Sequence, residues 1–323
     1  MSRYISYSKN SEKAMLKRVY LKNFCAFSEA DFKFSNNINV FVGDNGTCKS
    51  SILKLAYAAG SASFSADKFV MGKGNAHEYF SSKLKSSLTW TFKAKEISHL
   101  ANFNAEDYGV ANVFVEFEDE SQNIEVSFNN MSSSSFALKK TPYALVENKP
   151  IWIDFSTSLL NMPDSTCSES RVSDKKKISE ICENIISDLR FVVGKTIDID
   201  HFGRCCLVET AEPLNANCFS ESIIIMLVLL RLIKTGTVFG SGQLFLDSPD
   251  ANFGPRLTKT LAKTICALSE SGVQVFLATQ KKSMLEEIQS ASIEKDMNCK
   301  FFLHQISESG SLEIAEYLGE GQV

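Results

Sequence analysis

The segment GDNGTCKS at residues 43–50 constrains the fold more than any other part of the sequence. It matches the pattern G-x-x-x-x-G-K-[ST], except that Cys48 stands at the second glycine. An apolar, largely β-branched run at 38–42 precedes the segment, and a helical pattern begins at Lys49. This strand–loop–helix context predicts a loop whose backbone N–H groups, together with the helix N-terminus, bind phosphate oxygens.

The side chains of this loop have expected roles in binding a nucleoside triphosphate, ATP, with Mg²⁺. Lys49 neutralises the β- and γ-phosphates, Ser50 ligates Mg²⁺, and Ser51 reaches the α-phosphate. Cys48 adds bulk where a glycine lets the backbone approach the phosphates. A glycine-rich turn that binds nothing is the alternative, and the flanking strand and helix disfavour it. The predicted nucleotide-binding residues are Gly43, Asp44, Asn45, Gly46, Thr47, Cys48, Lys49, Ser50 and Ser51.

A second motif, LFLDSPDANFGP, lies at residues 244–255. An apolar strand that ends in an acid is the usual partner of a phosphate loop, so Asp247 is expected to hold Mg²⁺ through water or through Ser50. A strand that ends in an acidic turn is common by itself. The two motifs together, each in its strand context, are far more specific.

The remaining pattern predicts an α/β fold with a mixed sheet. The C-terminal half alternates helical and strand patterns, which is typical of a parallel sheet covered by helices. The N-terminal part adds an antiparallel hairpin at 113–118 and 124–128. Residues 61–65 are predicted to be a serine-rich loop and 163–173 a flexible connection. Heptads are not sustained over several turns, so no long coiled coil is expected.

The expected organisation is one head spanning residues 1–323, divided into three parts. An N-terminal lobe with the phosphate loop and the antiparallel strands covers 16–155. A small helical lobe covers 160–235. The second motif and the C-terminal α/β part cover 240–323.

Three segments resemble one family of ATPases. The segment LKNFCAFSEADFKFSNNINVFVGDNGTCKSSILKLAYA resembles the start of the ABC-type ATPase heads of the RecF/SMC/OLD group, the AAA-family ATPases found in defence systems such as Septu and retrons. LFLDSPDANF resembles that group's D-E-P-E-A-N-L-H-P, and VQVFLATQ resembles the strand that usually ends in a switch histidine. The resemblance covers residues 16–60 and 215–285, and it implies a P-loop fold of the ABC type.

The resemblance also implies a signature loop that acts in trans. In such families two heads sandwich two ATP molecules, and each head offers a signature, L-S-x-G, to its partner's γ-phosphate. Ser220 and Ser222, at the start of an apolar helix, stand where this signature is expected. The alternative for Ser220 is a plain helix N-cap.

Five positions depart from the group's pattern. They are Cys25, where an arginine often contacts phosphate, Cys48 in the loop, Ser222 in place of the signature glycine, Ser248 in place of the carboxylate that orients the attacking water, and Gln280 in place of the switch histidine. Losing a water-positioning carboxylate costs orders of magnitude in rate. The resemblance therefore implies a site in which nucleotide binding is better preserved than hydrolysis.

The candidate catalytic positions are Ser248, Asp250 and Gln280. Asp250 matches a usual glutamate of the group, but Pro249 leaves its direction open. Two hypotheses of different class follow, namely a slow ATPase and a non-hydrolysing, ATP-gated scaffold.

The composition excludes several other classes of protein. A net charge of −4 argues against a surface coated for non-specific DNA binding, although a local basic patch and DNA as a partner stay open. The nine cysteines form no C-x-x-C pair, and the four histidines give no zinc-ligand spacing. Scattered cysteines indicate reduced thiols in the cytoplasm. The longest apolar run, 223–230, is too short to span a bilayer, so no membrane partner is expected.

The sequence thus predicts an ATP- and Mg²⁺-binding head that self-associates, as a homodimer or a larger oligomer, when nucleotide binds. We expect it to control a separate effector protein in a bacterial anti-phage defence or DNA-transaction system. The alternative is a pseudo-ATPase whose role is the structural assembly of a partner complex.

Overall fold

The computed structural model describes residues 15–66, 76–102, 109–142, 146, 148–154, 175–200, 204–210, 212–215, 218–308 and 311–317. The chain forms two compact units. The first comprises Met1–Asn36, Gly43–Pro150 and Phe302–Tyr317, and the second comprises Asn37–Val42, Ile151–Phe301 and Leu318–Val323. The connection predicted at 163–173 lies outside the described residues.

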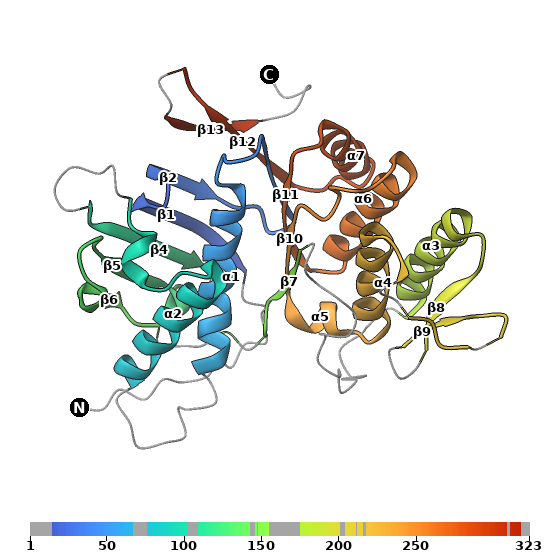
Figure 1. The fold of residues 1–323 in the computed structure, drawn as a ribbon, viewed down its shortest axis with the longest axis horizontal. Helices are drawn as coiled ribbons and strands as arrows, with labels where there is room; N and C mark the ends of the chain where they lie inside the picture. Colours follow the sequence, from blue (N-terminus) through green and yellow to red (C-terminus); the bar gives the residue numbers. More distant parts are fainter. Residues whose placement is uncertain are drawn as a thin grey trace. The chain divides into compact units, whose positions relative to one another are not determined.

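A five-stranded sheet organises the first unit (Figure 1). Its order is β2-β1-β4-β5-β6, and every neighbouring pair is antiparallel. The strands are β1 (Leu16–Phe24), β2 (Phe27–Lys33), β4 (Ala111–Phe117), β5 (Ile124–Phe128) and β6 (Ala137–Lys140). Alternate residues of β4 and β5 are buried, as expected of a sheet with one face on the core and one in solvent. The predicted hairpin is confirmed as β4 and β5.

Two helices, α1 (Lys49–Ala66) and α2 (Ala76–Phe92), pack against each other and cover one face of this sheet (Figure 1). Phe92 of α2 meets Phe24 of β1 edge to face, with ring centroids 5.6 Å apart. Short 3₁₀ turns lie at Ile97–Leu100, Glu120–Gln122 and Ser133–Ser135. The strands β12 (Cys299–Ile306) and β13 (Leu312–Tyr317) are hydrogen-bonded neighbours, and the first unit includes β12 from Phe302 onward.

The loop predicted at 61–65 is wrong, because α1 continues through these serines to Ala66. Packing explains the difference. Ala62 and Ser63 are buried, and the Ser63 hydroxyl accepts a hydrogen bond of 3.0 Å from the Val146 N–H. A tertiary contact therefore outweighs the weak helix propensity of serine.

Four parallel strands organise the second unit, in the order β3-β11-β10-β7. They are β3 (Ile38–Gly43, the first five residues of which belong to this unit), β11 (Gln274–Thr279), β10 (Gln243–Asp247) and β7 (Ile151–Ile153). Both β11 and β10 are buried almost throughout, which is typical of parallel strands with helices on both faces. The predicted parallel sheet is confirmed.

The helices of the second unit are α3 (Lys175–Val193), α4 (Glu221–Lys234), α5 (Thr237–Ser241), α6 (Pro255–Glu270) and α7 (Lys282–Ile293). Helix α4 is buried on nearly every side, whereas α3 and α6 are amphipathic. The longest helix in the described part of the chain, α3, has 19 residues, so the described residues hold no long coiled coil. Among the described residues, no helix combines the length and apolarity needed to cross a membrane.

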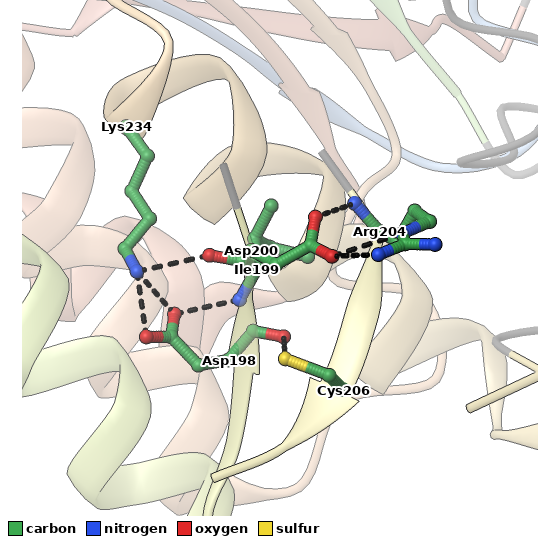
Figure 2. A network of polar contacts seen from close by, with 6 residues as sticks. All are labelled: Asp198, Ile199, Asp200, Arg204, Cys206 and Lys234. Carbon is green, nitrogen blue, oxygen red and sulfur yellow. Dashed lines mark hydrogen bonds and ion pairs between the residues drawn. The ribbon is translucent and has the colours of Figure 1, made fainter. Parts of the chain in front are cut away.

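A small antiparallel ribbon, β8 (Ile197–Ile199) and β9 (Cys205–Leu207), was not predicted from the sequence. Figure 2 shows how α4 fixes it: the Lys234 ammonium donates to both carboxylate oxygens of Asp198, each at 2.6 Å, and to the Ile199 carbonyl. The neighbouring Asp200 carboxylate accepts from the backbone and side chain of Arg204. These polar contacts compensate for strands of only three residues.

Candidate functional site

The phosphate loop joins β3 to α1, as predicted, and its backbone is unusual at three positions. Gly43, Gly46 and Cys48 have φ angles of +156°, +82° and +60°. A Cβ atom at Gly43 would lie 2.2 Å from the backbone oxygen of His304, so only glycine fits there. Cys48 adopts the left-handed conformation that glycine would take without strain.

Lys49 folds back over the loop that precedes it. Its ammonium donates to the Asp44 carbonyl at 2.6 Å and to the Thr47 hydroxyl at 3.2 Å, and the Thr47 hydroxyl donates to the same carbonyl. The Lys49 side chain is 6% exposed, whereas residues 44–46 at the tip of the loop are exposed. A buried ammonium thus lies against the loop, at the N-terminus of an 18-residue helix.

This donor set fits a phosphate chain. The ammonium, the backbone N–H groups of a loop in positive-φ conformations and the helix N-terminus all favour a bound anion. Phosphate oxygens can replace the Asp44 carbonyl and the Thr47 hydroxyl as acceptors for Lys49. Ser50 and Ser51 lie half-buried in the first turn of α1, within the same unit.

His304, on β12, supports the loop from within the first unit, and sequence reasoning missed it. Its Nδ1–H donates to the Thr47 carbonyl at 2.8 Å, and its ring stacks on Phe32 at 5.9 Å between centroids. Burial lowers the pKa of His304 to about 4, so the imidazole is neutral at physiological pH. A separation of 257 residues between the partners leaves no local signal for this contact.

The β1–β2 hairpin lies in the same unit as the loop and carries another of the unusual positions. Cys25 and Ala26 form its two-residue turn, with Cys25 at a φ of +50°. The Cys48 thiol donates to the Gly46 carbonyl at 3.7 Å, and burial raises the pKa of Cys25 to about 12 and raises that of Cys48 as well. Two of the five positions that depart from the family pattern therefore lie in the first unit.

The second motif lies in the other unit, at the carboxyl ends of its parallel strands. Asp247 ends β10 and pairs with Ala278 of β11, while Thr279 pairs with Val42 of β3. Asp247 and Thr279 therefore lie at one edge of this unit's sheet, the edge at which β3 also ends. This edge is where parallel α/β sheets bind ligands.

Ser248 and Asp250 are held tightly in this unit. Ser248 has a φ of +53°, and its N–H donates to the Ala278 carbonyl at 2.9 Å. The Asp250 carboxylate is 1% exposed and accepts from the Thr279 hydroxyl at 2.7 Å. Burial raises the pKa of Asp250, and the Thr279 hydrogen bond opposes that rise. Gln280, which follows Thr279, is exposed.

The direction of Asp250, which Pro249 left open, is therefore into the protein. The Thr279 hydroxyl in turn accepts from the Lys281 N–H at 3.0 Å, so the turn after β10 and the end of β11 form one hydrogen-bonded assembly. Thr279 is a second residue that sequence reasoning missed, although its place directly before Gln280 is a local signal.

The candidate signature lies at the start of α4. Ser220 occupies the N-cap position, but its hydroxyl makes no capping bond and instead pairs with the Ser222 hydroxyl at 3.0 Å. Ser220 is exposed and Ser222 is buried. Glu221 accepts a hydrogen bond from Asn252, which lies in the turn after β10. The start of α4 and the turn after β10 are thus in contact within the second unit.

The structure brings the predicted residues together in two groups, one in each unit. The loop residues 43–51 form the first group, and Asp247, Ser248, Asp250, Ser220 and Ser222 lie in the second unit with Gln280. Within the described ranges, no cluster of three or more His, Cys, Asp and Glu side chains is arranged to hold a metal ion. The individual roles of these residues stay predictions.

The comparisons with solved structures agree with this architecture. Similar chains include an SMC head bound to the C-winged helix domain of ScpA, with a TM-score of 0.59, 14% identity and coverage of 95% of this chain and 98% of that chain. The SMC head domain from Thermotoga maritima has a TM-score of 0.53, 14% identity and coverage of 94% and 100%. The Smc head domain from Pyrococcus furiosus, with an extended coiled coil and bound to the C-terminal domain of ScpA, has a TM-score of 0.58, 11% identity and coverage of 94% and 96%.

The fold and the phosphate loop define a mixed α/β P-loop ATPase domain with the architecture of an SMC head. A family model described as an AAA ATPase domain matches residues 15–198, which is more than half of the chain. The chain therefore belongs to this AAA ATPase domain family, and the family implies nucleotide binding. No curated protein matches the sequence.

Proposed function

We propose that the chain binds ATP through residues 43–51 and that this binding drives its self-association, which controls a separate effector protein. The observation that carries the proposal is the buried Lys49 ammonium, which donates to acceptors on its own loop that phosphate oxygens can replace. The glycine at position 43, where no other residue fits, supports the same role.

The proposal includes a Mg²⁺ ion bound together with ATP. Ser50 and Asp247 are the residues that would hold it, because hydroxyl and carboxylate oxygens suit this ion and it usually keeps several waters and phosphate oxygens as further ligands. The parallel pairing of β3, β11 and β10 supports this choice, since Val42, the residue before the loop, and Asp247 both lie at the carboxyl edge of the second unit's sheet. When bound, Mg²⁺ neutralises charge on the β- and γ-phosphates.

Self-association is tested by the mass of the purified chain in light scattering with and without ATP·Mg²⁺. We expect a larger mass with nucleotide, and the same increase to be lost in Ser220→Arg, because Ser220 is the exposed member of the candidate signature. Ser134→Arg, an exposed serine of the first unit's 3₁₀ turn, is the matched control and should associate normally. An unchanged mass with ATP·Mg²⁺ contradicts the proposed self-association.

The proposed setting is the bacterial cytoplasm, in anti-phage defence or a DNA transaction. The resemblance to the RecF/SMC/OLD group and the free thiols at the eight described cysteines support this setting. Purification of the tagged chain from its native host tests the effector. Recovery of a stable second protein, with a nuclease, toxin or reverse transcriptase encoded beside it, is expected. Recovery of the chain alone contradicts an effector partnership.

The second candidate is a scaffold that binds ATP without turnover. Two observations favour it: Ser248 supplies no carboxylate after Asp247, and the Asp250 carboxylate is buried against Thr279 rather than turned to solvent. A steady-state phosphate-release assay separates the two functions. Hydrolysis above background that disappears in Lys49→Ala would exclude the scaffold, and ATP binding without such hydrolysis would exclude the slow ATPase.

A further inference from the structure

An aromatic ring is exposed near the C-terminal end of α3, and a guanidinium is stacked on it. Phe191 is 70% exposed, although phenylalanine is one of the residues most often buried. The Arg256 guanidinium, from α6, lies 3.7 Å from the centre of this ring. At that distance the two groups are in van der Waals contact. Both residues belong to the second unit, in which α3 packs against α6 (Figure 1).

Hydrogen bonds to Asp188 fix the guanidinium in this place. Arg256 Nε donates to Asp188 Oδ1 at 2.7 Å, and the Thr260 hydroxyl donates to Asp188 Oδ2 at 2.6 Å. A carboxylate held by two residues of α6 therefore keeps the guanidinium over the ring. We call the Phe191 ring and the Arg256 guanidinium the stacking platform. It is already formed, so a ligand that stacks on it does not have to order it first.

Exposed cations continue from the stacking platform along α6. Lys259 and Lys263 follow Arg256 by three and seven residues, so the three side chains lie on the same side of the helix. Both lysines are exposed. Arg190 and Lys195, which flank Phe191 in the sequence, are exposed as well.

Two acids at this end of α3 are already engaged. Asp188 forms an ion pair with Arg256, and the Glu209 carboxylate accepts a hydrogen bond of 3.3 Å from the Thr196 N–H. The exposed lysines therefore add local positive charge to a chain whose net charge is −4. An exposed ring alone is typical of a surface that docks a protein, but a ring beside a row of cations favours a polyanion.

We propose that the stacking platform and the lysines after it bind single-stranded nucleic acid. An unpaired base stacks on Phe191, while Arg256, Lys259 and Lys263 contact phosphates. Every base has a π-face, so an aromatic ring beside a positively charged track binds single strands of any sequence. In a duplex the base faces are covered by their neighbours, so the stacking platform favours a single strand.

This inference goes beyond the proposed nucleotide binding. It concerns residues of the second unit, whereas residues 43–51 belong to the first, and it needs no ATP. The two proposals therefore succeed or fail separately.

The test measures the fluorescence anisotropy of a fluorescein-labelled oligothymidylate of about 20 nucleotides, titrated with the full chain in the absence of ATP. Saturable binding is expected, tighter than that of a duplex of the same length, and weaker at about 200 mM than at about 50 mM salt. Oligouridylate of the same length is titrated in parallel. Binding of either strand supports the proposal, and a preference between the two distinguishes DNA from RNA as the ligand.

Three substitutions of Phe191 separate stacking from an apolar contact. Phe191→Ala should weaken binding about fivefold or more, because the stacking of one base is lost. Phe191→Leu should be as weak, since leucine is apolar but has no ring, and Phe191→Trp should bind at least as tightly as the wild type. Trp90→Ala removes a ring that is 76% exposed in the first unit, and it is the matched control that should bind normally.

The lysines are tested through the dependence of binding on salt. Lys259→Ala and Lys263→Ala should each reduce the slope of log affinity against log salt concentration by about 0.7, the value for one phosphate contact on a single strand. Phe191→Ala should lower the affinity and leave this slope unchanged. Lys282→Ala removes an exposed lysine of α7 and should match the wild type.

Three results would overturn the proposal. The first is no binding of either oligonucleotide at low salt, and the exposed ring would then mark a contact with a protein. The second is equal binding of single strand and duplex, which would assign the affinity to charge alone. The third is a Phe191→Leu variant that binds as well as Phe191→Trp, because stacking would then contribute nothing.

Discussion

Gly43, where the chain enters the phosphate loop, has a φ of +156°. The His304 carbonyl oxygen lies 2.2 Å from the position that a Cβ atom would take at this residue. We predict that Gly43→Ala destabilises the fold by about 3 kcal/mol, because the new methyl group meets backbone that cannot move aside cheaply. Urea denaturation measures this change. Gly46→Ala is the matched control: nothing lies within 4 Å of its Cβ position, so only the strain of its +82° φ, about 1 kcal/mol, is expected. Equal losses in the two variants contradict this account.

His304 makes the stability of the first unit depend on pH. Its pKa is lowered to about 4 from an ordinary value of 6.5, so between these values the unfolded chain binds a proton that the native chain does not. Above pH 6.5, His304 therefore does not reduce the free energy of unfolding. As the pH falls from 6.5 toward 4, the free energy of unfolding decreases, by about 3 kcal/mol at most.

Urea denaturation of the wild type and of His304→Phe across this pH range checks the prediction. Phenylalanine suits the aromatic neighbours Phe27 and Phe32 but has no titrating group. The variant should lose about 1 kcal/mol at pH 7 with the Thr47 hydrogen bond, and its dependence on pH should be flatter. A slope as steep as that of the wild type would assign the acid sensitivity to other groups.

At the scale of elements, the ribbon of β8 and β9 depends on its contact with α4. We predict that Lys234→Met lowers the stability of this ribbon by about 1 kcal/mol, because the partly buried Asp198 carboxylate then loses its cation (Figure 2). Hydrogen exchange at residues 197–199 and 205–207 should accelerate, while exchange in β10 and β11 should not change. Lys282→Met, which removes a pair with side chains 87% and 59% exposed, should leave the ribbon unchanged.

Local patterns were sufficient for the elements that carry their own signal. The strand, the loop and the first half of the helix, over residues 38–58, and the buried strand that ends at Asp247 follow from periodicity and motif, whereas the continuation of α1 through the serines to Ala66 does not. Helix α2 was not predicted, although Phe80, Leu84 and Leu88 repeat every four residues, because the intervening serines and lysines weaken the pattern. The strands β8 and β9 have three residues each, too few to show an alternating pattern in the sequence, and they depend on the contact with α4.

The residues of the candidate site divide in the same way, into those with a local sequence signal and those placed by tertiary contacts. The loop residues and Asp247 were found because their spacing is local. The hydrogen bonds of His304 to Thr47 and of Thr279 to Asp250 are tertiary contacts. A close distance between residues far apart in the chain depends on the whole fold, and a single sequence holds no direct signal for it.

At the scale of the whole molecule, the chain has two units, and nucleotide binding can stabilise either one of them or both. ATP·Mg²⁺ at one hundred times its dissociation constant should stabilise the native chain by about 2.7 kcal/mol, because ligand binds the folded form alone. A thermal shift should report this in the wild type and vanish in Lys49→Ala, while Lys282→Ala, an exposed lysine, should keep it.

Hydrogen exchange then shows which elements ATP binding stabilises. Contacts with residues 43–51 alone would slow exchange in α1, which belongs to the first unit, and leave β10 and β11 of the second unit unchanged. If Asp247 also takes part through Mg²⁺, exchange should slow at the carboxyl ends of β10 and β11 as well, and Asp247→Asn should abolish that second effect while the effect in α1 persists. Protection confined to α1 in the wild type would show that the loop binds nucleotide without the second motif, and the proposed Mg²⁺ site would be wrong.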